Sequence, residues 1–274
     1  MTSSQSVEEL LESFRQASGS PRLIWYGPNH ERVELSGRVL ENWVAKTSNL
    51  LVEELDGTAD TVVHLDMPPH WKSLVWALAC WQVGALTRVP DDVDTATSGS
   101  GAEPAAGIGA ETRSRADIVV SMDAADTASP AQAASALGNP LQVLVAPGAL
   151  DMRWPGPLPD GAVDYAALVR SYGDVYLDPV ADGAAPLMAA GGRNHTFQEL
   201  AATPLDADPA GTDARKEPPL PGVWLVPAGL PLRTVLSAAV RIWAGGSAVV
   251  LVHPDVEITE RLVDGERVTA RLAP

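Results

Sequence analysis

The stretch that decides the fold runs from Thr61 to Pro90 and reads TVVHLDMPPHWKSLVWALACWQVGALTRVP. Residues 61–65 are mostly β-branched or apolar, as in a short buried strand, and two prolines end that strand. Residues 70–83 are nearly all apolar, which predicts a helix that is buried on most sides. Gly84 ends this helix, and residues 86–89 form the next strand. This β-α-β order predicts an α/β protein with a doubly wound, mostly parallel sheet.

The residues before this stretch predict two helices and a hairpin. Ser6 with Glu9 three residues later is a capping-box pattern for a first helix. Ser36 is a good N-cap for a second, longer helix. The expected hairpin strands are residues 22–26 and 32–35, joined by turn residues 27–30. The apolar stripe of the second helix consists of Val39, Leu40, Trp43, Val44, Thr47, Leu50, Leu51 and Leu55.

The residues after position 116 return to alternating strands and helices. The expected strands are 117–122, 141–146, 185–189, 223–226 and 248–252. The expected helices are 163–172, 195–202 with Thr196 as cap, and 232–244. A small hairpin is expected around Asp264–Gly265.

The chain divides into three parts by composition. Residues 1–90 form an N-terminal αβ segment, and residues 117–274 form a second αβ segment of the same fold. Residues 91–116 are rich in Asp, Ala, Ser and Gly and have little that could pack, so we expect a flexible linker or surface loop.

Composition excludes several classes of function. The chain has 274 residues, a net charge of -16 and a pI near 4.6, and such an acidic surface repels nucleic acids and anionic membranes. The single cysteine, Cys80, cannot form an internal disulfide, which fits a reducing cytoplasm. We find no signal-peptide pattern and no apolar run long enough to cross a bilayer. The many arginines and alanines indicate a GC-rich, actinobacterial genome.

Three segments, taken in order, carry a resemblance to a known family. They are Val33–Lys46 (VELSGRVLENWVAK), Val62–Pro68 (VVHLDMP) and Trp71–Pro90. Their order and spacing resemble the N-terminal part of the adenylate-forming superfamily, which includes acyl-CoA synthetases, nonribosomal-peptide adenylation domains and luciferases. The chain is also similar to a family of short actinobacterial proteins related to AMP-binding enzymes.

The resemblance implies an adenylate-forming fold without its C-terminal cap domain, because the chain stops at Pro274. It also places the phosphate loop at Ala189–Gly192, where such enzymes carry Ser/Thr-Gly-Thr-Thr-Gly followed by Pro-Lys-Gly. Here the loop hydroxyls and the lysine are missing. Adenylation builds negative charge on phosphorus and needs donors and cations aimed at it, so the usual stabilisation is not encoded at this loop.

The predicted cofactor-binding residues are Gly191, Gly192 and Arg193. A strand that ends in two glycines and leads into a capped helix leaves backbone N–H groups for the phosphate of ATP, AMP or CoA, and Arg193 adds a positive charge. The alternative is a tight structural turn. His195 is either a proton-transfer residue or a solvated loop residue.

The remaining candidate residues each have a structural alternative to a functional role. His70 and Trp71 open the apolar helix, where they either shape an acyl pocket or pack in the core. Cys80 in apolar surroundings is expected to be an inert thiol with a raised pKa. Two Asp-x-Asp motifs, Asp92–Asp94 and Asp206–Asp208, match a metal motif of sugar-nucleotide transferases but lie in aspartate-rich loops, and we predict no metal site.

The sequence therefore supports a degenerate AMP-binding-like protein that does not adenylate. It would bind a nucleotide or acyl ligand, or act through a protein partner, and we identify no catalytic residue. The alternative is an acyl-CoA ligase-type enzyme that activates a carboxylate with ATP, using noncanonical residues or a partner subunit. A third hypothesis is a sugar-nucleotide enzyme that uses one Asp-x-Asp motif.

Overall fold

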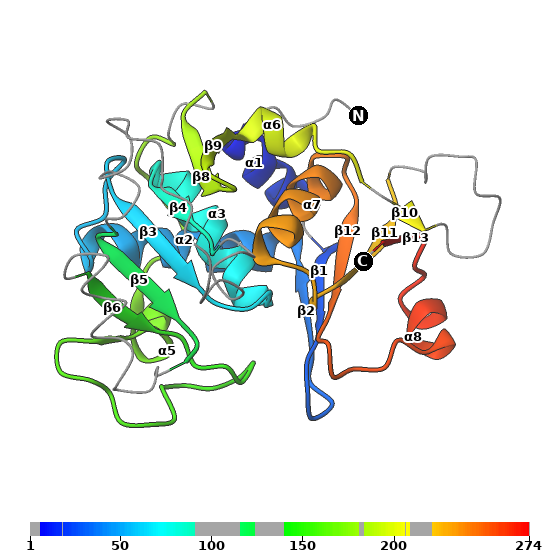
Figure 1. Ribbon diagram of the computed structural model, residues 1–274, viewed down its shortest axis with the longest axis horizontal. Coiled ribbons are helices and arrows are strands. Elements are labelled where there is room, and N and C mark those ends of the chain that lie inside the picture. The colour runs from blue at the N-terminus through cyan, green and yellow to red at the C-terminus, as the bar shows by residue number, and fades with distance from the viewer. Residues whose placement is uncertain are drawn as a thin grey trace, which may run out of the picture.

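The protein folds into two β-sheets with helices between them (Figure 1). The structure is a computed structural model that describes residues 6–17, 19–90, 116–123, 140–180, 184–205, 207–208 and 221–273. The six-stranded sheet has the order β10 (Ala207–Asp208), β13 (Ala270–Leu272), β11 (Val223–Pro227), β12 (Ala248–Val252), β1 (Pro21–Tyr26) and β2 (Arg32–Ser36). The seven-stranded sheet has the order β7 (Val163–Asp164), β6 (Leu141–Leu144), β5 (Ile118–Ser121), β3 (Val62–Asp66), β4 (Leu86–Arg88), β8 (Pro186–Ala190) and β9 (Arg193–Thr196).

The strands are mostly parallel, as the sequence predicts. In the seven-stranded sheet only β8 and β9 pair antiparallel, and in the six-stranded sheet only β1–β2 and β10–β13 do so within the described residues. The segments 1–90 and 117–274 each contribute strands to both sheets. The α/β class is thus confirmed, and the strands that the sequence pattern assigns to one sheet are shared between two. The predicted linker, residues 91–116, lies outside the described residues except for Ala116, which is buried.

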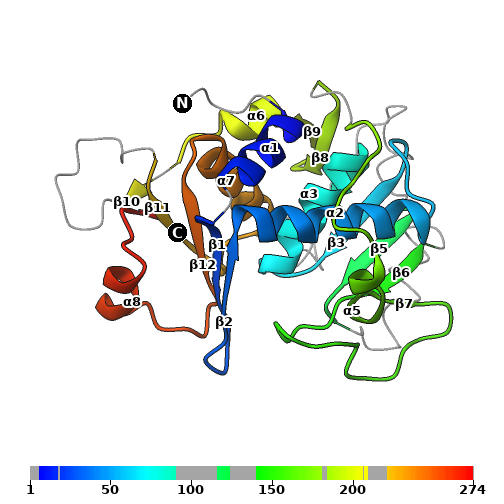
Figure 2. The same cartoon turned by 180° about the vertical axis from the view of Figure 1, so that it is seen from behind.

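Helix α3 (Trp71–Val83) occupies the centre of the molecule, and all thirteen of its residues are buried. Its sequence is nearly all apolar, with Lys72, Ser73 and Gln82 as its polar residues, which is the pattern of a helix surrounded by protein. His70 caps its N-terminus, and Gly84, with a φ of 92°, ends it in the left-handed conformation that glycine adopts without strain. Figures 1 and 2 show α3 between the two sheets. The helix predicted for residues 70–83 is confirmed, with His70 as its cap.

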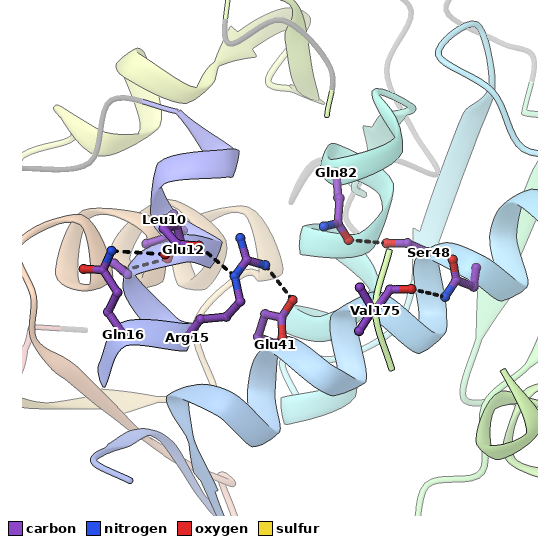
Figure 3. Close-up of polar contacts among 10 residues, drawn as sticks. Leu10, Glu12, Arg15, Gln16, Glu41, Ser48, Gln82 and Val175 are labelled. Carbon is purple, nitrogen blue, oxygen red and sulfur yellow. Dashed lines mark hydrogen bonds and ion pairs between the residues drawn. The ribbon is translucent and has the colours of Figure 1, made fainter. Parts of the chain in front are cut away.

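Helices α1 (Val7–Ala17) and α2 (Gly37–Glu53) pack beside α3 and are joined by polar contacts (Figure 3). Arg15 of α1 donates to Glu41 of α2 over 2.8 Å. Ser48 of α2 donates to Gln82 of α3, also over 2.8 Å. The predicted cap Ser36 accepts a hydrogen bond from the Val39 backbone N–H. Val39 itself was expected in the apolar stripe, but it is exposed at 41% because it faces away from α3 and the core.

The remaining helices cover the two sheets. They are α5 (Tyr165–Leu168), which continues as a 3-10 turn at Val169–Ser171, α6 (Phe197–Ala201), α7 (Leu232–Ala244) and α8 (Glu260–Gly265). Leu262 of α8 packs against Ile24, Leu225 and Val250, which form a second apolar cluster on the six-stranded sheet. No helix in the described part of the chain has the length and apolarity to cross a membrane.

Two local predictions are wrong. Residues 163–172 do not form one helix, because Val163–Asp164 pair with β6 as a strand and Asp164 then caps the short helix α5. The hairpin expected around Asp264–Gly265 is instead the end of α8, whose N-cap Thr259 accepts from the Leu262 backbone N–H.

Candidate functional site

Gly191 and Gly192 form the two-residue turn that joins β8 to β9. Their φ values are 60° and 73°, and a two-residue hairpin turn of this kind needs positive φ at both positions, where glycine meets no steric cost. Ala190 and Arg193 then pair across the hairpin. The expectation that the glycines lead directly into a helix is wrong, because strand β9 lies between them and α6.

The N-terminus of helix α6 is capped by side chains of the helix itself. Its cap Thr196 accepts from the Glu199 backbone N–H over 3.3 Å, and the Glu199 carboxylate accepts from the Thr196 backbone N–H over 2.9 Å. The capping box predicted from the sequence is therefore confirmed, and it satisfies two of the N–H groups that a phosphate would need. Binding of a phosphate by Gly191, Gly192 and Arg193 stays a prediction.

A small pocket of about 200 Å³ lies beside the glycine turn, at the carboxyl end of β8. Arg233, in the first turn of α7, is its cation, and the Arg233 Nη1 atom lies 3.9 Å from the point where a Gly191 Cβ would stand. His195 of β9 lines the same pocket. Arg193 is exposed and is not among the lining residues. We call this the glycine-turn pocket, and it is lined by Met188, Ala190, His195, Thr203, Pro204, Leu205, Arg233, Thr234, Ser237, Ala238, Leu272 and Ala273.

A larger cavity of about 480 Å³ lies at the carboxyl ends of strands from both sheets. Strands β1 and β12 of one sheet and β3 and β5 of the other end at it. Open α/β sheets place their ligands at this edge. We call it the strand-edge cavity, and it is lined by Trp25, Pro28, Glu31, Asp66, Met67, Pro68, Pro69, His70, Ser121, Met122, Asp123, Pro147 and His253.

His70 belongs to the wall of the strand-edge cavity and also caps α3. Its Nδ1 atom accepts from the Lys72 backbone N–H over 3.1 Å, so the neutral ring carries its proton on Nε2. Burial, with smaller effects from Lys72 and His253, lowers the pKa of His70 to about 3. The ring is therefore neutral at physiological pH. It contacts Trp25 edge to face, with ring centroids 4.6 Å apart, so His70 both packs in the core and lines a cavity.

The ammonium group of Lys72, two residues after His70, is hydrogen-bonded to backbone carbonyl oxygens. Its Nζ atom donates to the carbonyl oxygens of Ala146 and Gly148 over 2.6 and 2.7 Å. Burial is the main cause that lowers the pKa of Lys72 to about 8. The ammonium group therefore holds the loop after β6 in place, and Lys72 is not among the residues that line the cavity.

Three carboxylates, Glu31, Asp66 and Asp123, line the strand-edge cavity. Glu31 accepts from the Ala149 backbone N–H over 3.1 Å. In the part of the chain that the structure describes, no ion pair engages any of the three, and no Lys or Arg lines the cavity. These residues were not among the sequence candidates, although Asp66 directly follows the predicted strand 61–65 and Asp123 directly follows the predicted strand 117–122.

The other sequence candidates have structural roles or lie outside the described residues. Cys80 is fully buried on α3, and burial raises the pKa of its thiol far above the ordinary value. The motif Asp92–Asp94 and residue Asp206 are not among the described residues, and Ala207–Asp208 form strand β10. No group of three or more His, Cys, Asp or Glu residues is placed to hold a metal ion within the described ranges.

Comparisons with known proteins identify the fold. Over 97% of its length the chain matches an acyl-CoA synthetase of Brucella canis, with a TM-score of 0.61 and 16% identity, and it covers 46% of that protein. It matches a fatty acyl CoA synthetase of Mycobacterium tuberculosis over 96% of its length, with a TM-score of 0.59 and 18% identity, and covers 48% of it. The fold is therefore that of the N-terminal region of adenylate-forming enzymes, and the chain spans about half the length of these solved structures.

A relative of similar size also exists in Mycobacterium tuberculosis. The two sequences are 29% identical over 253 residues, which are 91% of this chain and 90% of the relative. The name of that relative states membership of a numbered protein family and no activity. No protein-family model matches the chain.

Proposed function

We propose that this chain is a degenerate adenylate-forming-like protein that binds a nucleotide or an acyl ligand without forming an acyl-adenylate. The observation that carries the proposal is the two-residue turn at Gly191–Gly192, which stands where the resemblance places a phosphate loop. A turn of two glycines holds no side-chain donor or cation, so it offers little to the charge that develops during adenylation.

The glycine-turn pocket is better suited to binding a phosphate group than to catalysing adenylate transfer from ATP. Arg233 and His195 supply a cationic and a polar group there, and an arginine beside a phosphate forms charge-assisted hydrogen bonds. At about 200 Å³ the pocket is smaller than the roughly 300–1,000 Å³ typical of a complete small-molecule site. This size fits the phosphate end of AMP or CoA rather than a whole ATP.

We expect carboxylate-dependent ATP–pyrophosphate exchange to stay at background for the purified protein. Without loop hydroxyls and lysine, the pentavalent phosphorus lacks its stabilising donors. The assay uses a panel of fatty and aromatic acids, with a competent acyl-CoA synthetase as the positive control. Exchange clearly above background with any acid would contradict the proposal.

Arg233→Ala is expected to weaken AMP binding about tenfold, the effect of one lost charge-assisted contact. Arg193→Ala is the matched control, because Arg193 is exposed and lies outside the pocket lining. Calorimetric titration of AMP and CoA against wild type and both variants measures the difference. Equal affinities for the three proteins, or a loss confined to Arg193→Ala, would show that the glycine-turn pocket does not hold the phosphate.

The alternative function is ATP-dependent carboxylate activation with noncanonical residues or with a partner subunit. The observation in its favour is the placement of Arg233 and His195 together at the carboxyl end of β8. Under this alternative the exchange assay is positive, either for the chain alone or after addition of the partner, and Arg233→Ala abolishes it.

A further inference from the structure

Strand β2 is the last strand of the six-stranded sheet, and it pairs with β1 alone among the described strands (Figure 2). Tyr26 of β1 lies opposite Arg32, and its carbonyl oxygen accepts from the His253 N–H on the far side of β1. Because backbone groups alternate in direction along an antiparallel ladder, the N–H and C=O groups of Arg32 and Glu34 point away from β1. Within the described ranges, neither of these two N–H groups donates to another segment.

The exposed face of this edge carries one charge of each sign. The side chains of Arg32 and Glu34 are 40% and 44% exposed and form an ion pair of 2.7 Å. Val33, between them, points to the other face and packs against the main core. A free strand edge is a template for another strand, and charged side chains normally discourage such pairing. Because the two charges here have opposite signs, their effect depends on the register in which a second strand pairs.

A second copy of β2 fits this edge in one antiparallel register. If the two-fold axis passes through Val33, Arg32 of each copy lies opposite Glu34 of the other, and each of these pairs exchanges both of its backbone hydrogen bonds. Opposite charges placed directly across two strands stabilise the pairing. An axis through Arg32 or through Glu34 would instead place two like charges opposite each other, which destabilises the pairing.

We propose that β2 is the interface of a homodimer in which two copies of the chain pair antiparallel about Val33 and join their six-stranded sheets. The net charge of -16 on each copy opposes association, and a single pair of short strands is a small interface. The dimer is therefore weak and forms as the protein concentration rises. No residue of β2 lines the glycine-turn pocket, so the inference does not rest on nucleotide binding.

Sedimentation velocity of the full chain tests the interface by charge reversal. The protein is measured over about a hundredfold range of concentration, across which mass action should shift wild type from monomer to dimer. Arg32→Glu and Glu34→Arg each place like charges opposite each other at two pairs per dimer, and each should weaken dimerisation at least about tenfold. An equimolar mixture of the two variants restores opposite charges at both pairs, so it should form heterodimers about as readily as wild type forms homodimers.

Two further variants separate the backbone pairing from net charge. Glu34→Pro removes an N–H that β1 does not use, a change that edge strands tolerate, and it should abolish the dimer. Asp60→Arg is the matched control for Glu34→Arg, because it makes the same change of charge at an exposed aspartate outside β2, and it should dimerise at least as well as wild type. Circular dichroism confirms that each variant is folded.

Three results would overturn the proposal. They are a wild-type chain that stays monomeric over the whole range, charge-reversal or proline variants that dimerise like wild type, and a mixture of Arg32→Glu with Glu34→Arg that stays monomeric. Arg32 also contacts Glu266 and Tyr26, so Glu34→Arg, which keeps both partners, is the decisive single variant. Arg233→Ala, which tests the nucleotide pocket, should leave dimerisation unaltered, so the two proposals fail separately.

Discussion

Replacing Trp76 by alanine is expected to cost about 3–5 kcal/mol of the free energy of unfolding. Trp76 is 0% exposed and lies on α3, between the two sheets. Its ring packs on Tyr165, with centroids 5.1 Å apart, and Tyr165 in turn hydrogen-bonds Thr47 of α2 over 2.8 Å. Domains are stable by roughly 5–15 kcal/mol, so this one truncation removes a large part of the total. Urea unfolding followed by circular dichroism measures the loss.

Two further variants separate packing from other causes. The Trp76 Nε1 atom has no hydrogen-bond partner within the described residues, so Trp76→Phe loses volume but no hydrogen bond and should cost less than Trp76→Ala. Val39→Ala, on the exposed face of α2, should change stability by no more than about 0.5 kcal/mol. If the free energy of unfolding of Trp76→Ala lies within about 1 kcal/mol of the wild-type value, the packing of α3 does not stabilise the core as the structure implies.

The central helix could be predicted from the sequence because every signal agrees there. Residues 71–83 are nearly all apolar, a strand precedes them, and Gly84 ends the helix. Local propensity, burial and topology point to the same structure, which is the condition under which sequence patterns are most informative. The division of the strands into two sheets could not be predicted from local patterns, since it depends on pairings between distant segments such as β1 with β12.

The short elements could not be predicted because their signals are local and ambiguous. Strand β9 reads Arg-Asn-His-Thr, with no apolar alternation, and it exists because the glycine turn returns it along β8. The tail around Leu262 and Val263 fits either a hairpin or a helix by periodicity. Leu262 packs against the six-stranded sheet, and this contact favours the helix. The contact joins segments that are distant in the sequence, so it cannot be predicted from a local stretch.

The candidate sites show the same limit. From the sequence, Gly191, Gly192 and Arg193 are predicted to bind a phosphate, with Arg193 as the nearest cation along the chain, and this stays a prediction. The structure adds a second cation, Arg233 of α7, which lines the glycine-turn pocket and is distant from the turn in the sequence. The strand-edge cavity collects side chains from three strands, β1, β3 and β5, and from the residues that follow strands of both sheets. Only residues at strand ends, such as Asp66, could have been suspected from the sequence.

Gly37→Ala is expected to destabilise the protein by about 1–3 kcal/mol through overpacking between α1 and α2. A Cβ added at Gly37 would lie 2.3 Å from the backbone oxygen of Phe14 and 3.0 Å from its carbonyl carbon. These are backbone atoms of α1, so no side-chain rotation relieves the clash. Phe14 is fully buried and meets Trp243 of α7 edge to face, with centroids 5.5 Å apart.

The resulting movement of α1 should be visible in its contacts as well as in stability. Displacing α1 from α2 stretches the Arg15–Glu41 ion pair of 2.8 Å (Figure 3) and loosens the Phe14–Trp243 contact. We therefore expect a weaker near-ultraviolet circular dichroism signal together with a lower urea midpoint. Gly265→Ala is the matched control, because a Cβ there meets no atom within 4 Å. If both alanine variants unfold at the same urea concentration as wild type, α1 is not held against the start of α2 as closely as the structure places it.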